Sequence, residues 1–156
     1  SYAGAVKTGE FEMEYFRFGS GERTLLILPG LSIQSVMGAK DTVEEGYAVM
    51  KDDFTTYVFD RRKEIPGDYS IKDMADDTAV VMNELGLKDV YVFGASQGGM
   101  IAQQMSIRHP DKVNSLVLAV TASRPDNLMR ESIGTWLRMS EHDDYKGIML
   151  DTAESK

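Results

Sequence analysis

Residues 90–100 constrain the fold of this chain more than any other segment. An apolar run typical of a β-strand, Val90 to Phe93, leads into Gly94-Ala95-Ser96-Gln97-Gly98, and the residues that follow are compatible with a helix. Glycine two residues before and two residues after the serine lets the backbone turn sharply, because larger side chains would collide at those positions. The pattern therefore predicts a strand, a tight turn that presents the Ser96 hydroxyl, and a helix.

The chain has no well-placed base for this serine. A serine hydroxyl is a weak nucleophile and needs a histidine, itself oriented by a carboxylate. The two histidines are His109 and His142. If residues 97–108 form one helix, its rise of roughly 1.5 Å per residue puts His109 about 20 Å from Ser96, whereas a base must come within about 3 Å. We therefore interpret His109 as a polar residue at a helix end, and His142, in a charged run, as part of a solvated helix end.

Length and composition restrict the class of protein. With 156 residues, 42% of them hydrophobic, the chain can bury one ordinary core, so we expect one domain or part of one. The formal charge of −8 argues against nucleic-acid binding, and no apolar run is long enough to span a membrane. The chain has no cysteine, which excludes disulfides and thiolate metal sites. We expect a cytoplasmic protein without a metal, a cofactor, or a nucleic-acid or membrane partner.

Strand and helix patterns alternate along the chain. Four short apolar runs are typical of strands covered on both faces, and they lie at residues 24–28, 57–59, 90–93 and 116–120. Helical stretches lie between them, at residues 36–50, at residues 71–85 and after the Ser96 turn. This order predicts an α/β fold, a mainly parallel sheet with helices on both faces.

Local signals refine this expectation. Ser70 and Asp73 form a capping pair at the start of the second helix, and Gly86 is expected to end it. Residues 11–18 alternate apolar and polar side chains like a half-buried strand, which Gly19 to Gly21 are expected to turn back in a hairpin with residues 24–28. In the helix after Ser96, the apolar side chains Met100, Ile101 and Met105 are expected to pack on the sheet.

Four loops are expected to meet at one edge of the sheet, because ligands of such sheets bind beyond the carboxyl ends of the strands. These loops are Pro29 to Ser32, Asp60 to Arg62, the Ser96 turn and Thr121 to Ser123. Asp60 could contact a substrate there, but an aspartate that ends a strand is more typical of a loop anchor.

These features together resemble the α/β-hydrolase superfamily. The resemblance rests on the Gly94 to Gly98 turn, on Leu-Pro-Gly-Leu at residues 28–31 where the superfamily usually has His-Gly, on Asp60-Arg61 after a strand, and on residues 108–113 before the run at 116–118. Four such motifs in the same order make coincidence a poor explanation. The resemblance covers essentially the whole chain and implies the N-terminal part of an α/β-hydrolase fold.

The resemblance also implies roles for individual residues. Ser96 is expected to be the nucleophile of a nucleophile elbow, with Gly94 and Gly98 as its glycines. The backbone amides of Leu31 and Gln97 are expected to form the oxyanion hole. Proline at position 29 should stiffen the oxyanion loop without removing the Leu31 amide.

The chain is expected to end inside the cap of such a fold, before its last strands. Residues 1–125 are interpreted as the N-terminal part of the core, and residues 126–156, with apolar residues at helical spacing, as two short helices that begin a cap or lid. Trp136, with Ser32 and Thr121, is a candidate for the substrate pocket. Asp126 is a further candidate for the catalytic acid. The base and remaining strands are expected on a complementary C-terminal polypeptide or to be absent, and the chain to form homo-oligomers if it has no such partner.

Three functions remain open at this point. The first is a serine hydrolase that cleaves a small carboxylic ester, thioester or amide through an acyl-enzyme on Ser96, with residues 1–156 alone inactive. The second is a catalytically dead hydrolase fold that serves as a binding or scaffold module, which the absence of a well-placed histidine favours. The third is a lyase that uses the same pocket. Fold alone does not separate them.

Overall fold

The computed structural model describes residues 1–29, 35–95, 97–119 and 147–150. Within these ranges, seven strands form one sheet: β1 (Tyr2–Lys7), β2 (Glu12–Gly19), β3 (Arg23–Leu28), β4 (Phe54–Arg62), β5 (Val90–Ala95), β6 (Val113–Ala119) and β7 (Gly147–Leu150). The α-helices are α1 (Lys40–Gly46), α2 (Ile71–Glu84) and α3 (Gln97–Arg108), and short 3₁₀ turns span Val36–Ala39, Ala48–Met50 and Pro110–Lys112.

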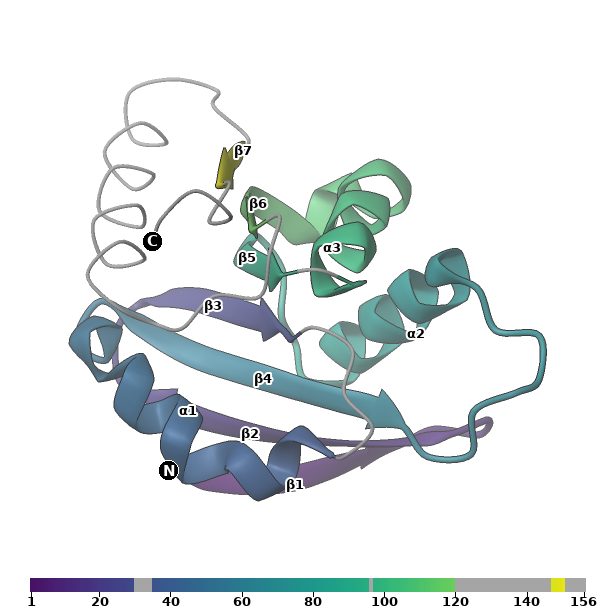
Figure 1. Cartoon of the computed structure of the whole chain (residues 1–156), viewed down its shortest axis with the longest axis horizontal. Coiled ribbons are helices and arrows are strands. Elements are labelled where there is room, and N and C mark those ends of the chain that lie inside the picture. Colours follow the sequence, from purple (N-terminus) through teal and green to yellow (C-terminus); the bar gives the residue numbers. More distant parts are fainter. Residues whose placement is uncertain (30–34, 96, 120–146, 151–156) are drawn as a thin grey trace.

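The sheet has the order β1-β2-β4-β3-β5-β6-β7 (Figure 1). The five strands from β4 to β7 in this order are parallel, whereas β2 is antiparallel to β4 and β1 is antiparallel to β2. In the middle of the sheet, Leu26 pairs with Tyr57 on one side and with Val92 on the other. The prediction of a mainly parallel sheet is confirmed.

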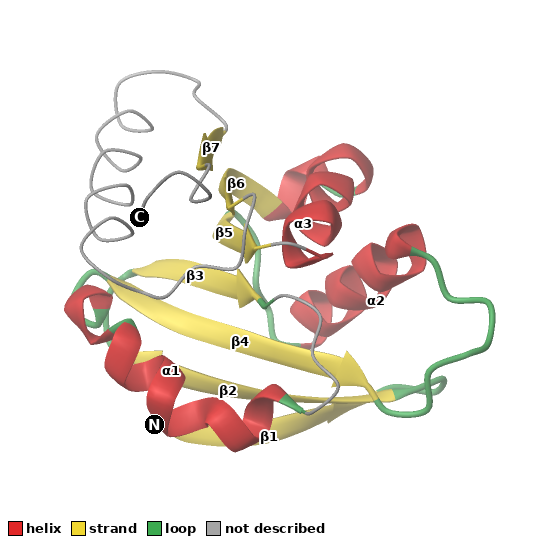
Figure 2. Cartoon of the chain, in the orientation of Figure 1, coloured by secondary structure: helices red, strands yellow, loops and turns green. Residues whose placement is uncertain are grey.

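Both faces of the central strands are buried, which explains their uninterrupted apolar sequences. Leu26 and Leu28 pack with α2 and α3 on one face, in a cluster that includes Met82 and Met105. Leu25 and Ile27 point to the other face, where they cluster with aromatic residues of the neighbouring strands, and the segment around α1 covers this cluster. Figure 2 shows helices on the two sides of the sheet, as predicted.

The second helix begins and ends where its sequence predicts. The Ser70 side chain accepts from the Asp73 amide at 3.1 Å, and the Asp73 carboxylate accepts from the Ser70 amide at 2.9 Å, so the capping box is complete. Gly86 follows the helix with a φ of +71°, a conformation that glycine adopts without strain. The helix predicted at residues 36–50 is instead divided into a 3₁₀ turn, α1 and a second 3₁₀ turn.

The predicted hairpin between residues 11–18 and 24–28 is wrong. The hairpin partner of β2 is β1, which the sequence analysis did not predict, and the other neighbour of β2 is β4. The backbone of the Gly19 to Gly21 segment packs directly against the backbone at the start of β4. A Cβ on Gly21 would lie 2.0 Å from the carbonyl carbon of Asp53. Because β3 and β4 pair in parallel through a crossover, β4 lies between the two expected hairpin strands.

Two further expectations need correction. The segment expected as a second cap helix contains β7, a strand that pairs in parallel with β6. A short apolar run such as residues 148–150 is compatible with a helix or a strand, and its pairing with β6 makes it a strand. In α3, Ile101 and Met105 are buried as expected, but Met100 is 50% exposed.

No helix in the described part of the chain is long and apolar enough to cross a membrane.

Candidate active site

β3 pairs in parallel with both β4 and β5, so the carboxyl ends of these strands lie at one edge of the sheet. The segment expected as a loop at Asp60 to Arg62 is instead the last three residues of β4. Leu28, the last residue of β3, pairs with Gly94 near the end of β5, and Ile27 pairs with Val58 of β4. Pro29 directly after β3, Arg61 near the end of β4 and Gln97 at the start of α3 therefore lie close together. The Thr121 loop lies outside the described residues.

The two glycines of the predicted elbow are required by close backbone contacts. A Cβ on Gly94 would lie 2.4 Å from the carbonyl oxygen of Gly98. A Cβ on Gly98 would lie 1.9 Å from the carbonyl oxygen of Leu28 and 2.7 Å from that of Pro29. The start of α3 is thus packed directly on the end of β3, at a distance that only glycine permits.

Gln97 is the first residue of α3, and its side chain is half-buried. The first amides of a helix have no partner within the helix, and the helix dipole places partial positive charge there. This position suits an amide that is to stabilise a negatively charged oxygen.

Arg61 connects the two segments that carry the predicted oxyanion donors. Its Nη2 donates to the carbonyl oxygen of Pro29 at 3.1 Å and to Oε1 of Gln97 at 2.9 Å. Burial lowers the pKa of the Arg61 guanidinium, and the neighbouring Asp60 carboxylate acts in the opposite direction. Arginine titrates so far above neutrality that the side chain remains a cation. In the sequence, Arg61 stands out only as part of the Asp60-Arg61 motif, without a role of its own.

Asp60 has the anchoring role that we predicted. Its Oδ2 accepts from the Ser35 hydroxyl at 2.5 Å, and its Oδ1 accepts from the Val36 amide at 3.4 Å. Both partners lie at the far end of the loop that begins at Pro29. Asp60 and Arg61, adjacent at the end of β4, therefore bind the two ends of this loop.

His109 lies at the opposite end of α3 from Gln97, as the helix length predicts. Its Nε2 lies 2.8 Å from Oδ1 of Asp76, and Arg108 donates to both oxygens of the same carboxylate at 2.9 and 2.7 Å. The Arg108 hydrogen bonds, with His109, lower the Asp76 pKa to about 2. This arrangement joins α3 to α2 and leaves His109 away from the elbow, whereas His142 lies outside the described residues.

Several predicted site residues lie outside the described residues: Leu31, Ser32, Ser96, Thr121, Asp126 and Trp136. Their roles remain predictions.

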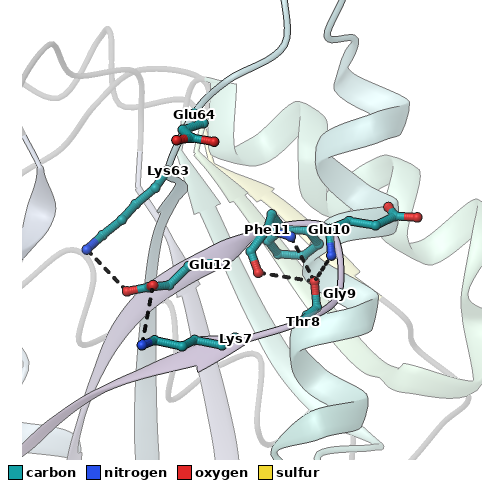
Figure 3. A pocket seen from close by; sticks show the side chains of 8 residues that line it. All are labelled: Lys7, Thr8, Gly9, Glu10, Phe11, Glu12, Lys63 and Glu64. Carbon is teal, nitrogen blue, oxygen red and sulfur yellow. Dashed lines mark hydrogen bonds and ion pairs between the residues drawn. The ribbon is translucent and has the colours of Figure 1, made fainter.

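A pocket of about 360 Å³ lies elsewhere, at the turn between β1 and β2 (Figure 3). Its lining is mostly charged. Lys63 lies 3.2 Å and Lys7 lies 4.0 Å from carboxylate oxygens of Glu12. The Thr8 hydroxyl closes the turn by accepting from the amides of Glu10 and Phe11. The lining residues belong to the β1–β2 turn and to the segment directly after β4, and Lys63 joins these two segments through Glu12 and Glu14. We therefore interpret these interactions as part of the hairpin rather than of the elbow site.

Comparisons with known proteins place the chain in one family. A sequence profile described as alpha/beta hydrolase fold matches residues 23–140. Over 77 residues the chain is 38% identical to "Putative carbamate hydrolase RutD" of Caulobacter vibrioides, an alignment that covers 49% of this chain and 29% of that protein. Over 87 residues it is 29% identical to a homoserine O-acetyltransferase of Thermus thermophilus, which covers 56% of this chain and 21% of that protein. The matches therefore span less than a third of these relatives.

Solved structures agree on the fold. A hydrolase from Pseudomonas aeruginosa superposes with a TM-score of 0.63 at 23% identity, over 89% of this chain and 55% of that one. E-2-(acetamidomethylene)succinate hydrolase superposes with a TM-score of 0.62 at 23% identity, over 74% and 43%. With well over half of its length matched by the family profile and its sheet shared with these structures, the chain belongs to the α/β hydrolase fold family.

Proposed function

We propose that the intact protein is a serine hydrolase that cleaves a small acyl compound through an acyl-enzyme on Ser96. The observation that supports this most is the backbone contact between Gly98 and the carbonyls of Leu28 and Pro29. It holds the first turn of α3 against the loop that leads to Leu31. Ser96 immediately precedes Gln97, so the nucleophile and both proposed oxyanion donors belong to segments in direct contact.

The proposed chemistry has two steps. Oγ of Ser96 attacks the acyl carbon while a base takes its proton, and the oxygen of the tetrahedral intermediate is held by the amides of Leu31 and Gln97. The bond to the leaving group then breaks, and the leaving alcohol, thiol or amine takes the proton. Water, deprotonated by the same base, attacks the acyl-enzyme, and the carboxylic acid leaves as Ser96 recovers its proton.

We further propose that the base comes from a histidine outside the described residues. His109 is paired with Asp76 at the far end of α3, and His142 is expected in a solvated helix end. We therefore propose that another segment of the intact protein, a complementary C-terminal polypeptide or a second copy of the chain supplies the base. Residues 1–156 on their own are then expected to show negligible turnover, because a triad without its base loses several orders of magnitude in rate.

The names of two relatives agree with a reaction at an acyl carbon. One is named as a putative carbamate hydrolase and the other as a homoserine O-acetyltransferase. We propose a small ester, thioester, carbamate or amide, held in a pocket to which Ser32, Thr121 and Trp136 contribute. A cap that begins near residue 126 and a cytoplasmic location are further proposals.

Hydrolysis of p-nitrophenyl acetate by the intact protein tests the proposal. We expect steady release of p-nitrophenol that the Ser96→Ala substitution abolishes while leaving the unfolding curve unchanged. Release that survives the substitution would contradict the assignment of Ser96. Mass spectrometry of the native and then the denatured protein shows whether a second polypeptide or a second copy is present.

The scaffold function is the second candidate, because His109 is used to join two helices rather than to activate a serine. It predicts that the intact protein neither releases p-nitrophenol above the rate of Ser96→Ala nor forms a covalent adduct with a serine-directed phosphonate. A lyase would form product from its own substrate without any acyl-enzyme.

A further inference from the structure

We propose that Arg61 is a positioning residue that sets the separation of the two oxyanion donors. This inference rests on the proposed function, in which the amides of Leu31 and Gln97 bind the oxyanion. One donor lies on the loop after β3 and the other at the start of α3. Neither segment belongs to the other's secondary structure, so their separation depends on contacts between them.

One nitrogen of the Arg61 guanidinium binds both segments. Nη2 donates to the Pro29 carbonyl, two residues before Leu31, and to the Gln97 side chain, on the residue that supplies the second amide. A guanidinium is planar and its donors are fixed in direction, so two acceptors that share one nitrogen are held at a defined angle.

Proline at position 29 makes this bond more important. Proline has neither a backbone N–H nor a polar side chain, so its carbonyl is the group through which a side chain can bind it. Arg61 binds that carbonyl.

Asp60 completes the restraint at the other end of the loop. It accepts from Ser35 and Val36, so the loop that contains Leu31 is held at Pro29 by Arg61 and at Ser35 by Asp60. Both anchors belong to β4, a central strand of the sheet. Both ends of the loop are thereby bound to the same rigid strand, and Arg61 also binds Gln97 at the start of α3.

The experiment compares Arg61→Ala, Arg61→Lys and Gln97→Ala in the intact protein, with Arg108→Ala as the matched control. Arg108 also pairs with polar side chains of another element, but at the end of α3 away from the elbow. We expect Arg61→Ala to lower kcat for p-nitrophenyl acetate by about 10- to 100-fold, because misplacement by about 1 Å can have that effect, with KM little changed. Gln97→Ala keeps the backbone amide and should lower kcat less.

Three readouts separate positioning from a general loss of structure. Arg61→Lys should recover part of kcat, since it restores a donor without the planar fork. Guanidinium ion at concentrations that do not unfold the protein should raise kcat of Arg61→Ala and leave Arg108→Ala unchanged. The loss in the double variant Arg61→Ala with Gln97→Ala should be smaller than the product of the single losses, because the two side chains share one bond.

The outcomes distinguish this inference from the proposed function. If Ser96→Ala abolishes hydrolysis but Arg61→Ala leaves kcat as high as Arg108→Ala does, the positioning role is refuted and the proposed function stands. If hydrolysis survives Ser96→Ala, the proposed function fails and the inference fails with it. If Arg61→Ala does not fold, Arg61→Lys and Gln97→Ala test the positioning role instead. A kcat equal to that of the unsubstituted protein in both variants refutes the role of Arg61.

Discussion

Substitution of Gly98 by alanine perturbs the contact on which the proposed site depends. The added Cβ would lie 1.9 Å from the Leu28 carbonyl oxygen, 2.6 Å from its carbon and 2.7 Å from the Pro29 oxygen. All three are backbone atoms, so no side chain can rotate away. The first turn of α3 and the end of β3 must separate by roughly 1.5 Å to reach an ordinary contact distance.

This displacement predicts a larger effect on catalysis than on stability. Overpacking of this kind costs about 1–3 kcal/mol in the free energy of unfolding. A shift of about 1 Å between the two oxyanion donors can lower kcat by about 100-fold. We therefore expect Gly98→Ala to fold, to unfold at lower urea concentration, and to lose most of its turnover of p-nitrophenyl acetate.

Gly67→Ala is the matched control, because a Cβ there meets nothing within 4 Å. It should leave both kcat and the urea midpoint close to those of the unsubstituted protein. Turnover of Gly98→Ala within a factor of about two of the control would refute the reasoning, since the proposed oxyanion hole could not then depend on this contact.

Two further predictions concern stability. The folded-state pKa of Asp76 is lowered to about 2, so its interaction with Arg108 and His109 stabilises the fold fully above the unfolded-state pKa near 3.8 and is lost as pH falls towards 2. The Asp76 side chain is 39% exposed, so solvent screens its interaction with Arg108. Asp76→Asn should therefore remove only about 0.5–1 kcal/mol of this pH-dependent stability, measured by urea titrations at pH 5 and at pH 2.5. Asp41→Asn, at a fully exposed carboxylate, is the control. An equal pH dependence in Asp76→Asn and the unsubstituted protein would contradict this. Ser70→Ala removes the side chain that caps α2 and should lower the free energy of unfolding by about 1 kcal/mol, and a midpoint unchanged in urea would show that the capping box contributes little.

The sequence predicted the elements whose information is local. The central strands are predictable because burial on both faces gives uninterrupted apolar runs. Helix α2 is predictable because its capping box and the glycine that follows it each depend on a few neighbouring residues. The alternating residues 11–18 were recognised as a strand, but its partners are chosen by contacts with β1 and β4 that no local pattern encodes.

The candidate site was predictable to a similar degree. The glycines of the elbow carry a local signal, and their close contacts give it a physical reason. Arg61 was missed as a site residue because its role follows from the register of β4 beside β3 and from the position of Gln97 at the start of α3. The signal that could have identified it is its position near the carboxyl end of a strand expected beside the strand that leads to the oxyanion loop. Met100 was wrongly predicted to be buried. Successive residues of a helix point in different directions, so Met100 faces solvent although its neighbour Ile101 faces the sheet.

Peptide mapping of the intact protein after reaction with a fluorophosphonate tests the central claim most directly. Such a reagent forms a covalent bond with an activated serine, loses fluoride and adds a fixed mass to one peptide. We predict one adduct per chain, on Ser96, absent from Ser96→Ala and slower to form in Gly98→Ala. An adduct on another residue, or no adduct while the protein hydrolyses p-nitrophenyl acetate, would contradict the assignment of Ser96 as the nucleophile.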